Sequence, residues 1–199
     1  INDTSPSHHF GCLLVMQNLR YLLQQHNIEV LWGWPVSTDW RQQRKQFESL
    51  PEVDAFIING EGTLHNNASR RFSQALVDFC QAYAPHKPVY LLNATLHNNT
   101  ADAYQTLSLC RKIFVRDCNS LTELQQHDVD GQYAPDLTFA RRFATENGST
   151  PTGVLVTDSA VKQDTAWLNS LAASLHYTFR SLLVPHPCHP RFLLRPRPF

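Results

Sequence analysis

The sequence predicts an α/β protein built around a doubly wound, mostly parallel sheet. Short apolar runs such as 56–58 and 89–92 lack polar alternation, which is typical of strands buried on both faces. Amphipathic segments with helical spacing separate these runs, and a strict alternation of strands and helices favours a parallel sheet. The chain has 199 residues, of which 42% are hydrophobic, and this is enough for a packed core.

The expected elements follow one another in a regular order. Strands are expected at 29–32, 56–58, 89–92 and 112–115, and Ile1 is interpreted as the end of a further strand. Helices are expected at 13–26, 37–50, 67–83, 101–110 and 119–126. The expected buried face of the helix at 67–83 consists of Phe72, Leu76, Phe79 and Cys80.

A change in composition divides the chain. Residues 139–152 are rich in polar residues, glycine and proline, so we expect a first domain at 1–140 and a linker at 141–152. A second α/β domain is expected to start at 153–184, with strands at 153–156 and 177–184 and a helix at 164–176. Five prolines and three arginines at 185–199 predict an irregular tail, for which a truncated or non-native end is the favoured interpretation.

Charge and cysteine content exclude several classes of protein. Seventeen basic and seventeen acidic residues cancel, so no global field favours nucleic acid. No apolar run has the length of a transmembrane helix. Five cysteines without a C-x-x-C pair indicate a reducing compartment with free thiols, and we therefore expect a cytoplasmic protein. The His186-Pro187-Cys188-His189 segment lacks a fourth ligand, and no metal site is expected.

The densest group of polar residues follows the strand expected at 56–58. Asn59-Gly60-Glu61-Gly62-Thr63-Leu64-His65-Asn66-Asn67 places six polar side chains around two glycines. Open α/β sheets bind ligands beyond the carboxyl ends of their strands, and glycine lets the backbone approach a ligand closely. The alternative is a tight turn with a solvated glutamate. The number of polar side chains favours a binding or catalytic site.

These residues also resemble the signature of the polysaccharide pyruvyl transferase family. Further matching blocks occur in the same order as in that family: Asn2-Asp3-Thr4-Ser5, His8-His9-Phe10-Gly11-Cys12, Leu92-Asn93-Ala94, Val115-Arg116-Asp117 with Ser120, Pro135-Asp136-Leu137 and Val156-Thr157-Asp158-Ser159. The similarity extends from Ile1 to about Ser159. It implies a Rossmann-like domain that resembles the N-terminal half of a GT-B fold.

The resemblance implies transfer of a pyruvyl group from phosphoenolpyruvate to two hydroxyls of a sugar in a surface polysaccharide or its precursor. Phosphoenolpyruvate would be the donor substrate, and no separate cofactor is expected. The partners would be the donor and the sugar acceptor, with possible peripheral association with membrane-bound glycan precursors. The candidate substrate-binding residues are Asn2, Asp3, Ser5, His8, His9, Asn59, Gly60, Gly62, Thr63, Asn66, Asn93, Arg116, Asp158 and Ser159.

Glu61 and His65 are the candidates for acid and base catalysis. Histidine titrates near neutrality, and a carboxylate four residues away could orient it or raise its pKa. Glu61 could instead hold its own loop, and His65 could bond the backbone at a helix start. Arg116 could bind an anion or form an internal salt bridge with Asp117 or Asp136.

Two other functions remain open. The chain could be a truncated, non-catalytic module that binds a sugar or nucleotide, or a GT-B glycosyltransferase that uses a nucleotide sugar. The absence of a G-x-G-x-x-G fingerprint disfavours the nucleotide-sugar enzyme. Because the resemblance ends early in the second domain, this chain is expected to bind an acceptor sugar weakly without turning over phosphoenolpyruvate.

Overall fold

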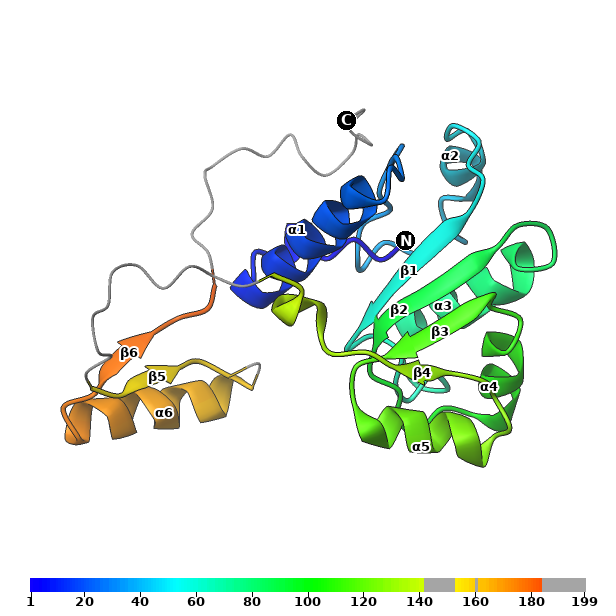
Figure 1. Ribbon diagram of the computed structural model, residues 1–199. Coiled ribbons are helices and arrows are strands. Elements are labelled where there is room, and N and C mark those ends of the chain that lie inside the picture. The colour runs from blue at the N-terminus through cyan, green and yellow to red at the C-terminus, as the bar shows by residue number, and fades with distance from the viewer. Residues whose placement is uncertain (142–152, 160, 184–199) are drawn as a thin grey trace.

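A four-stranded parallel sheet forms the centre of the computed structural model, which describes residues 1–141, 153–159 and 161–183 (Figure 1). Its strands are β1 (Phe56–Glu61), β2 (Val89–Ala94), β3 (Lys112–Val115) and β4 (Gln132–Tyr133), in the spatial order β1-β2-β3-β4. Ile58 pairs with Leu91 in the centre of the sheet. The predicted α/β class with a parallel, Rossmann-like sheet is confirmed.

Three helices connect successive strands and cover one face of the sheet. They are α3 (Arg71–Tyr83), α4 (Ala101–Leu107) and α5 (Cys118–Gln126), and they bury Ile58, Leu91 and Ile113 in the main core. A further helix, α1 (Phe10–Gln25), lies beside the strands on the opposite side (Figure 1). Met16 and Leu19 of α1 line a groove of about 740 Å³ that also contacts Ile57, Tyr90 and Leu92.

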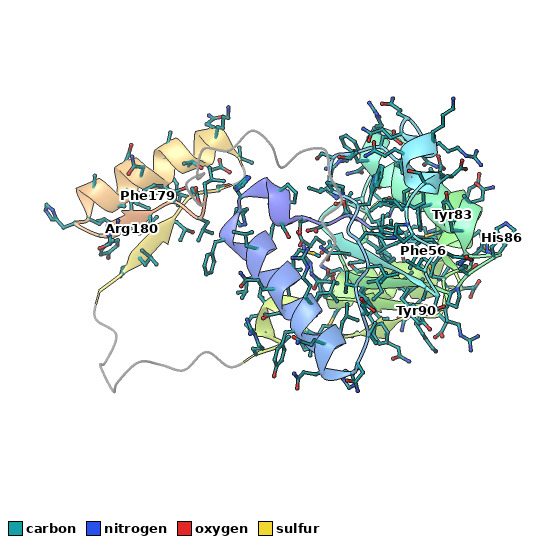
Figure 2. All side chains as sticks on the ribbon, turned by 90° about the horizontal axis from the view of Figure 1, so that it is seen from above. Phe56, Tyr83, His86, Tyr90, Phe179 and Arg180 are labelled. Atoms are coloured by element: carbon teal, nitrogen blue, oxygen red, sulfur yellow. The ribbon has the colours of Figure 1, made fainter. Side chains whose placement is uncertain are left out.

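An aromatic cluster joins α3 to the segment that precedes β1. Phe79 and Tyr83 stack with a ring separation of 4.5 Å, and both lie within 6 Å of Phe47, which belongs to α2 (Arg44–Glu48). Figure 2 shows Phe56 of β1 beside Tyr83, and their ring centroids are 5.3 Å apart. Burial of these rings, at about 1.5–3 kcal/mol for each large apolar side chain, holds the short helix α2 against the core.

Two expectations about the segment before β1 are wrong. Residues 29–32 do not form a strand; Val30 to Trp32 line the groove together with Phe56 and Ile57 of β1. Trp32 instead packs edge-on against Phe47, with ring centroids 5.5 Å apart. The helix expected at 37–50 is limited to 44–48. Residues 40–43 form turns, and Asp39 is engaged by the guanidinium groups of Arg41 and Arg71.

The helix expected at 67–83 begins only at Arg71. The carbonyl of Asn66 accepts hydrogen bonds from the N–H groups of Ser69 and Arg70, and this turn delays the helix. Leu76, Phe79 and Cys80 are buried as expected, whereas Phe72 is half-buried. The helix α4 ends at Leu107 rather than Cys110, which bonds back to Leu107 in a tight turn.

A smaller unit follows the first sheet. It contains β5 (Leu155–Thr157), α6 (Lys162–Ser174) and β6 (Thr178–Arg180), and its two strands pair in parallel. Figure 2 shows Phe179 and Arg180 of β6 in this unit, on the far side of α1 from the main sheet. The N–H of Phe10 donates to the carbonyl of Leu182 at 2.8 Å, so the start of α1 contacts the chain after β6.

Most of the expected linker at 141–152 and the whole of the expected tail at 185–199 lie outside the described residues. Among the helices that the structure describes, none combines the length and apolar character needed to cross a membrane.

Candidate functional site

Glu61 is the centre of a polar cluster at the carboxyl end of β1. Its carboxylate accepts hydrogen bonds from the hydroxyl of Thr4 at 2.6 Å, the amide of Asn59 at 3.0 Å and the thiol of Cys12 at 3.3 Å. Glu61 is 9% exposed, so few of these contacts are shared with water. Burial raises the pKa of the Cys12 thiol, which keeps it protonated and able to donate. The carboxylate therefore joins the first loop (residues 2–9) and the start of α1 to the end of β1.

Asn2 ties the same loop to the turn after β1. Its side-chain amide donates to the carbonyl of Asn59 at 2.6 Å and to the hydroxyl of Thr63 at 3.0 Å. The turn itself is closed by the N–H of Thr63, which donates to the carbonyl of Gly60 at 3.0 Å. These contacts place Asn2, Asn59, Gly60 and Thr63, all of them predicted binding residues, within the Glu61 cluster.

Several residues of the cluster have a left-handed backbone. The φ angles of Asn2, Glu61 and Asn93 are 62°, 37° and 57°. Asparagine adopts this conformation more readily than most residues, but it is uncommon for glutamate. A residue of this kind costs about 1–3 kcal/mol and persists where its surroundings hold it in place, often at binding sites. The backbone at Glu61 is thus held in a conformation that aims its side chain toward the first loop.

The two glycines of the motif have different roles. A Cβ atom on Gly60 would lie 2.5 Å from the Cβ of Ala94, so glycine is required there for close packing of β1 against β2. A Cβ atom on Gly62 would meet only the Nη2 of Arg116, at 3.9 Å. Gly62 therefore borders open space beside Arg116, whereas Gly60 faces the neighbouring strand.

Arg116 extends the cluster from the end of β3. Its Nε donates to the hydroxyl of Thr95 at 2.8 Å, and its Nη1 forms a salt bridge with Asp136 at 2.8 Å. Asp136 is thus its internal partner, whereas Asp117 caps α5 by accepting the N–H of Ser120. The Nη2 of Arg116 remains directed toward Gly62.

Two buried amide atoms near the carboxyl ends of β1 and β2 have no hydrogen-bond partner within the described residues. They are the Oδ1 of Asn59 and the Nδ2 of Asn93, whose residues are 1% and 5% exposed. The other side-chain atom of Asn93 accepts the N–H of Leu137 at 3.0 Å, which fixes the amide orientation. An unpaired buried polar atom costs about 1–3 kcal/mol. One buried acceptor and one buried donor therefore remain unsatisfied at the ends of β1 and β2.

His65 belongs to a separate group of residues. Its Nδ1 lies 2.9 Å from the Nη1 of Arg70, and its backbone pairs with that of His97, whose ring contacts Glu123 at 3.0 Å. Burial and the charge of Arg70 lower the pKa of His65. The expectation that Glu61 raises this pKa is wrong, because the two residues leave β1 and its turn in different directions.

Asn66 belongs to the His65 group as well. Its Oδ1 accepts the amide of Asn98 at 2.7 Å, and its backbone φ is 50°. The structure thus divides the predicted residues of the 59–66 segment between two polar groups at the ends of the same strands.

The remaining predicted residues of the first loop stabilise the loop itself. Asp3 accepts the N–H and hydroxyl of Ser5 and forms a salt bridge with Arg20 at 2.8 Å. His9 caps α1 by accepting the N–H of Gly11, and His8 adopts a left-handed backbone between the cap and the preceding turn. These contacts give Asp3, Ser5 and His9 structural partners of their own.

Asp158 and Ser159 lie in the smaller unit, just after β5. Asp158 accepts hydrogen bonds from the hydroxyl of Ser181 and the N–H of Leu182, and these hold its pKa below the usual range. Ser159 bonds to Thr165 at the start of α6. These hydrogen bonds lie within the smaller unit, although His9 is near enough to Asp158 to lower its pKa further.

Thr4 and Cys12 were not among the residues expected to form the site. Both belong to the sequence blocks around Asn2 and His9, but their contact with Glu61 spans 57 and 49 residues of chain. Within the described residues no group of three or more histidine, cysteine, aspartate or glutamate side chains could hold a metal ion. The His186 to His189 segment lies outside the described residues.

Comparison with known proteins supports the fold. No family model and no curated protein matches the chain. Among solved structures, the chain is similar to a functionally uncharacterised protein from Klebsiella pneumoniae subsp. pneumoniae NTUH-K2044, with 11% sequence identity and a TM-score of 0.52. The matched region covers 79% of this chain and 56% of that protein, so the chain corresponds to little more than half of its length. At this identity the similarity extends to the fold alone.

Proposed function

We propose that the chain carries the acceptor-binding half of a pyruvyl transferase that acts on a sugar of a surface polysaccharide or its precursor. The observation that carries the proposal is the Glu61 carboxylate, which is nearly buried, has a left-handed backbone and is fixed by Thr4, Cys12 and Asn59. A carboxylate held in this way at a strand end has a fixed position in which to bind a hydroxyl group of a ligand. The resemblance of 59–65 to the family signature points to the same reaction.

The reaction joins two sugar hydroxyls to one carbon of phosphoenolpyruvate. Protonation of the methylene carbon makes the adjacent carbon electrophilic, and the first hydroxyl oxygen attacks it while losing its proton. The second hydroxyl oxygen then displaces phosphate, and the products are a cyclic ketal and inorganic phosphate. Of the two protons that the hydroxyls lose, one replaces the proton added to the methylene carbon, and the other leaves with inorganic phosphate.

Glu61 is proposed to accept the proton of the attacking hydroxyl. Its Oε1 already receives two hydrogen bonds, whereas Oε2 receives only the weak bond from Cys12 and retains capacity for a sugar hydroxyl. The unpartnered Oδ1 of Asn59 and Nδ2 of Asn93 could bind two further hydroxyls, one as acceptor and one as donor. Because these atoms are buried, a sugar that lacks one of the two hydroxyls would leave a buried polar atom unpaired and bind more weakly. This favours selectivity for one sugar.

His65 is not suited to protonate the donor in this arrangement. A histidine whose pKa is lowered is mostly neutral at pH 7, and Arg70 occupies one of its ring nitrogens. We therefore assign His65 to substrate contact from the edge of the site. The acid that protonates the methylene carbon would come from another part of the complete enzyme.

A non-catalytic sugar-binding role is the second candidate for this chain. Arg116 is the cationic side chain that the described contacts bring to the cluster, and Asp136 already balances its charge. Transfer from phosphoenolpyruvate requires the charges of its phosphate and carboxylate to be neutralised. We therefore expect this chain to bind acceptor without turning over the donor.

The test combines two measurements on the purified chain. Binding of a panel of glycosides that can be pyruvylated is followed by ligand-observed NMR, and phosphate release from phosphoenolpyruvate is measured with the same panel. Glu61→Gln removes the proposed proton acceptor with little change in size. Glu52→Gln is the matched control, because Glu52 is a surface carboxylate paired only with Lys87 in the described contacts.

We expect at least one glycoside to bind the wild type and the Glu52→Gln variant, with binding weakened about tenfold or more in Glu61→Gln. No phosphate release is expected. If no glycoside binds, the proposed acceptor site is wrong. Phosphate release that Glu61→Gln or His65→Ala abolishes would show that this chain contains the donor site, and would eliminate the non-catalytic alternative.

A further inference from the structure

Two cysteines from different elements face each other in the main core. The Sγ of Cys110, in the turn between α4 and β3, lies 3.5 Å from the Sγ of Cys80 on α3. Cys80 is fully buried, whereas Cys110 is half-buried. The other described cysteines have different surroundings, since Cys12 contacts Glu61 and Cys118 is exposed at the start of α5.

We propose that Cys80 and Cys110 form a site of reversible disulfide modification by small-molecule disulfides such as oxidised glutathione. All four described cysteines are free thiols in this structure. A disulfide bond measures about 2.05 Å, so the two sulfurs must approach each other by about 1.5 Å. Cys110 lies in a short turn, closed by its N–H bond to the carbonyl of Leu107, rather than in a helix or strand. The turn can supply the movement more easily than the packed helix α3.

The difference in exposure between the two thiols determines which of them reacts first with oxidised glutathione. The hydrogen bond between Cys80 and Cys110 and the burial of Cys80 raise the pKa of Cys80 well above its usual value, which makes it a poor first nucleophile. The half-buried Cys110 thiolate therefore attacks oxidised glutathione, forming a mixed disulfide and releasing one glutathione thiolate. Cys80 then loses its proton and attacks the Cys110 sulfur of the mixed disulfide. This step forms the protein disulfide and releases the second glutathione thiolate, so two thiols are oxidised and one disulfide is reduced.

The bond would connect α3 to the turn that leads into β3. It would close a loop of 30 residues that contains β2 and α4. A cross-link of this length restricts the unfolded chain, and we expect the oxidised protein to melt about 5–10 °C above the reduced protein. The modification is thus expected to alter stability without blocking the Glu61 cluster, which neither Cys80 nor Cys110 contacts in the described part of the chain.

The experiment treats the full, folded chain with oxidised and reduced glutathione at a series of ratios. The chain is then unfolded in acid, the remaining thiols are alkylated, and peptides are identified by mass spectrometry. From five cysteines in the sequence, we expect the Cys80 and Cys110 thiols to be lost together in one cross-linked peptide that dithiothreitol removes, and glutathione bound to the exposed Cys118 is distinguished by its added mass. Cys118→Ser is the matched control and should form the same bond. Cys80→Ala keeps the buried position apolar and should instead accumulate glutathione on Cys110.

Each contrary result overturns the proposal. A folded chain that retains five thiols at the most oxidising ratio shows that the sulfurs cannot approach. A bond that forms only in urea shows that the folded arrangement does not direct it. A cross-link that persists in Cys110→Ser, or disappears in Cys118→Ser, assigns the reactivity to other cysteines. Circular dichroism of each variant establishes that it is folded before it is oxidised.

Discussion

Replacing Gly60 by alanine should destabilise the sheet at the contact between β1 and β2. The added Cβ would lie 2.5 Å from the Cβ and 2.7 Å from the Cα of Ala94. Carbon atoms pack best at about 3.5–4.0 Å, so the strands must separate locally by about 1 Å. The backbone bond from the N–H of Thr95 to the carbonyl of Glu61, now 2.7 Å long, lies next to this contact and would weaken. Overpacking and one weakened hydrogen bond together cost about 2–4 kcal/mol.

This cost corresponds to a decrease of about 5–15 °C in the melting temperature of a protein of this size, measured by circular dichroism. Gly62→Ala is the matched control, since its added Cβ has open space, and should change the melting temperature by about 2 °C or less. The double variant Gly60→Ala with Ala94→Gly removes the clash between the two Cβ atoms. It leaves the close approach to the backbone at position 94, so it should recover only part of the loss. A Gly60→Ala variant that melts within about 1 °C of the wild type would refute the packing argument.

Two further predictions concern charged groups. Arg70→Gln should raise the pKa of the His65 ring, because it removes a neighbouring positive charge while the burial of the ring is unchanged. The pKa is measured by NMR titration. An unchanged or lower pKa would contradict the contact between Arg70 and His65. Asp39→Asn should lower stability to urea by about 2 kcal/mol at pH 7, because Arg41 and Arg71 lose a buried carboxylate. The hydrogen bond from Arg41 holds the pKa of Asp39 well below its usual value, so the wild-type advantage is present above about pH 4 and decreases as the pH falls further. An equal loss at pH 3 and pH 7 would argue against this ion pair as the cause.

The strands of the main sheet were predictable because their apolar character is local. A strand covered on both faces must be apolar at successive positions, as 56–58 and 89–92 are. The same pattern failed at 29–32, because a strand also needs a hydrogen-bonding neighbour. Residues 29–32 line a groove instead, and no property of these residues alone indicates it.

The candidate site was predictable in position but not in its contacts. Glu61 was expected at a strand end because a glycine-rich polar segment follows an apolar run. Its pairing with His65 assumed that residues four apart are neighbours, which is true on a helix. Here the backbone turns after β1, where Thr63 bonds back to Gly60, and His65 leaves in another direction. The contacts of Glu61 with Thr4 and Cys12 depend on how distant segments fold together.

The helix α1 contacts both the Glu61 cluster and the chain that follows β4. At its centre the fully buried Asn18 donates to the carbonyl of Leu137 at 2.7 Å and accepts the Nε of Arg141 at 2.8 Å, so it holds the chain where it leaves the four-stranded sheet. In its first turn, about 9 Å away along the axis, Cys12 bonds to Glu61. The same helix therefore connects the chain that leaves the four-stranded sheet with one of the three donors that fix the Glu61 carboxylate.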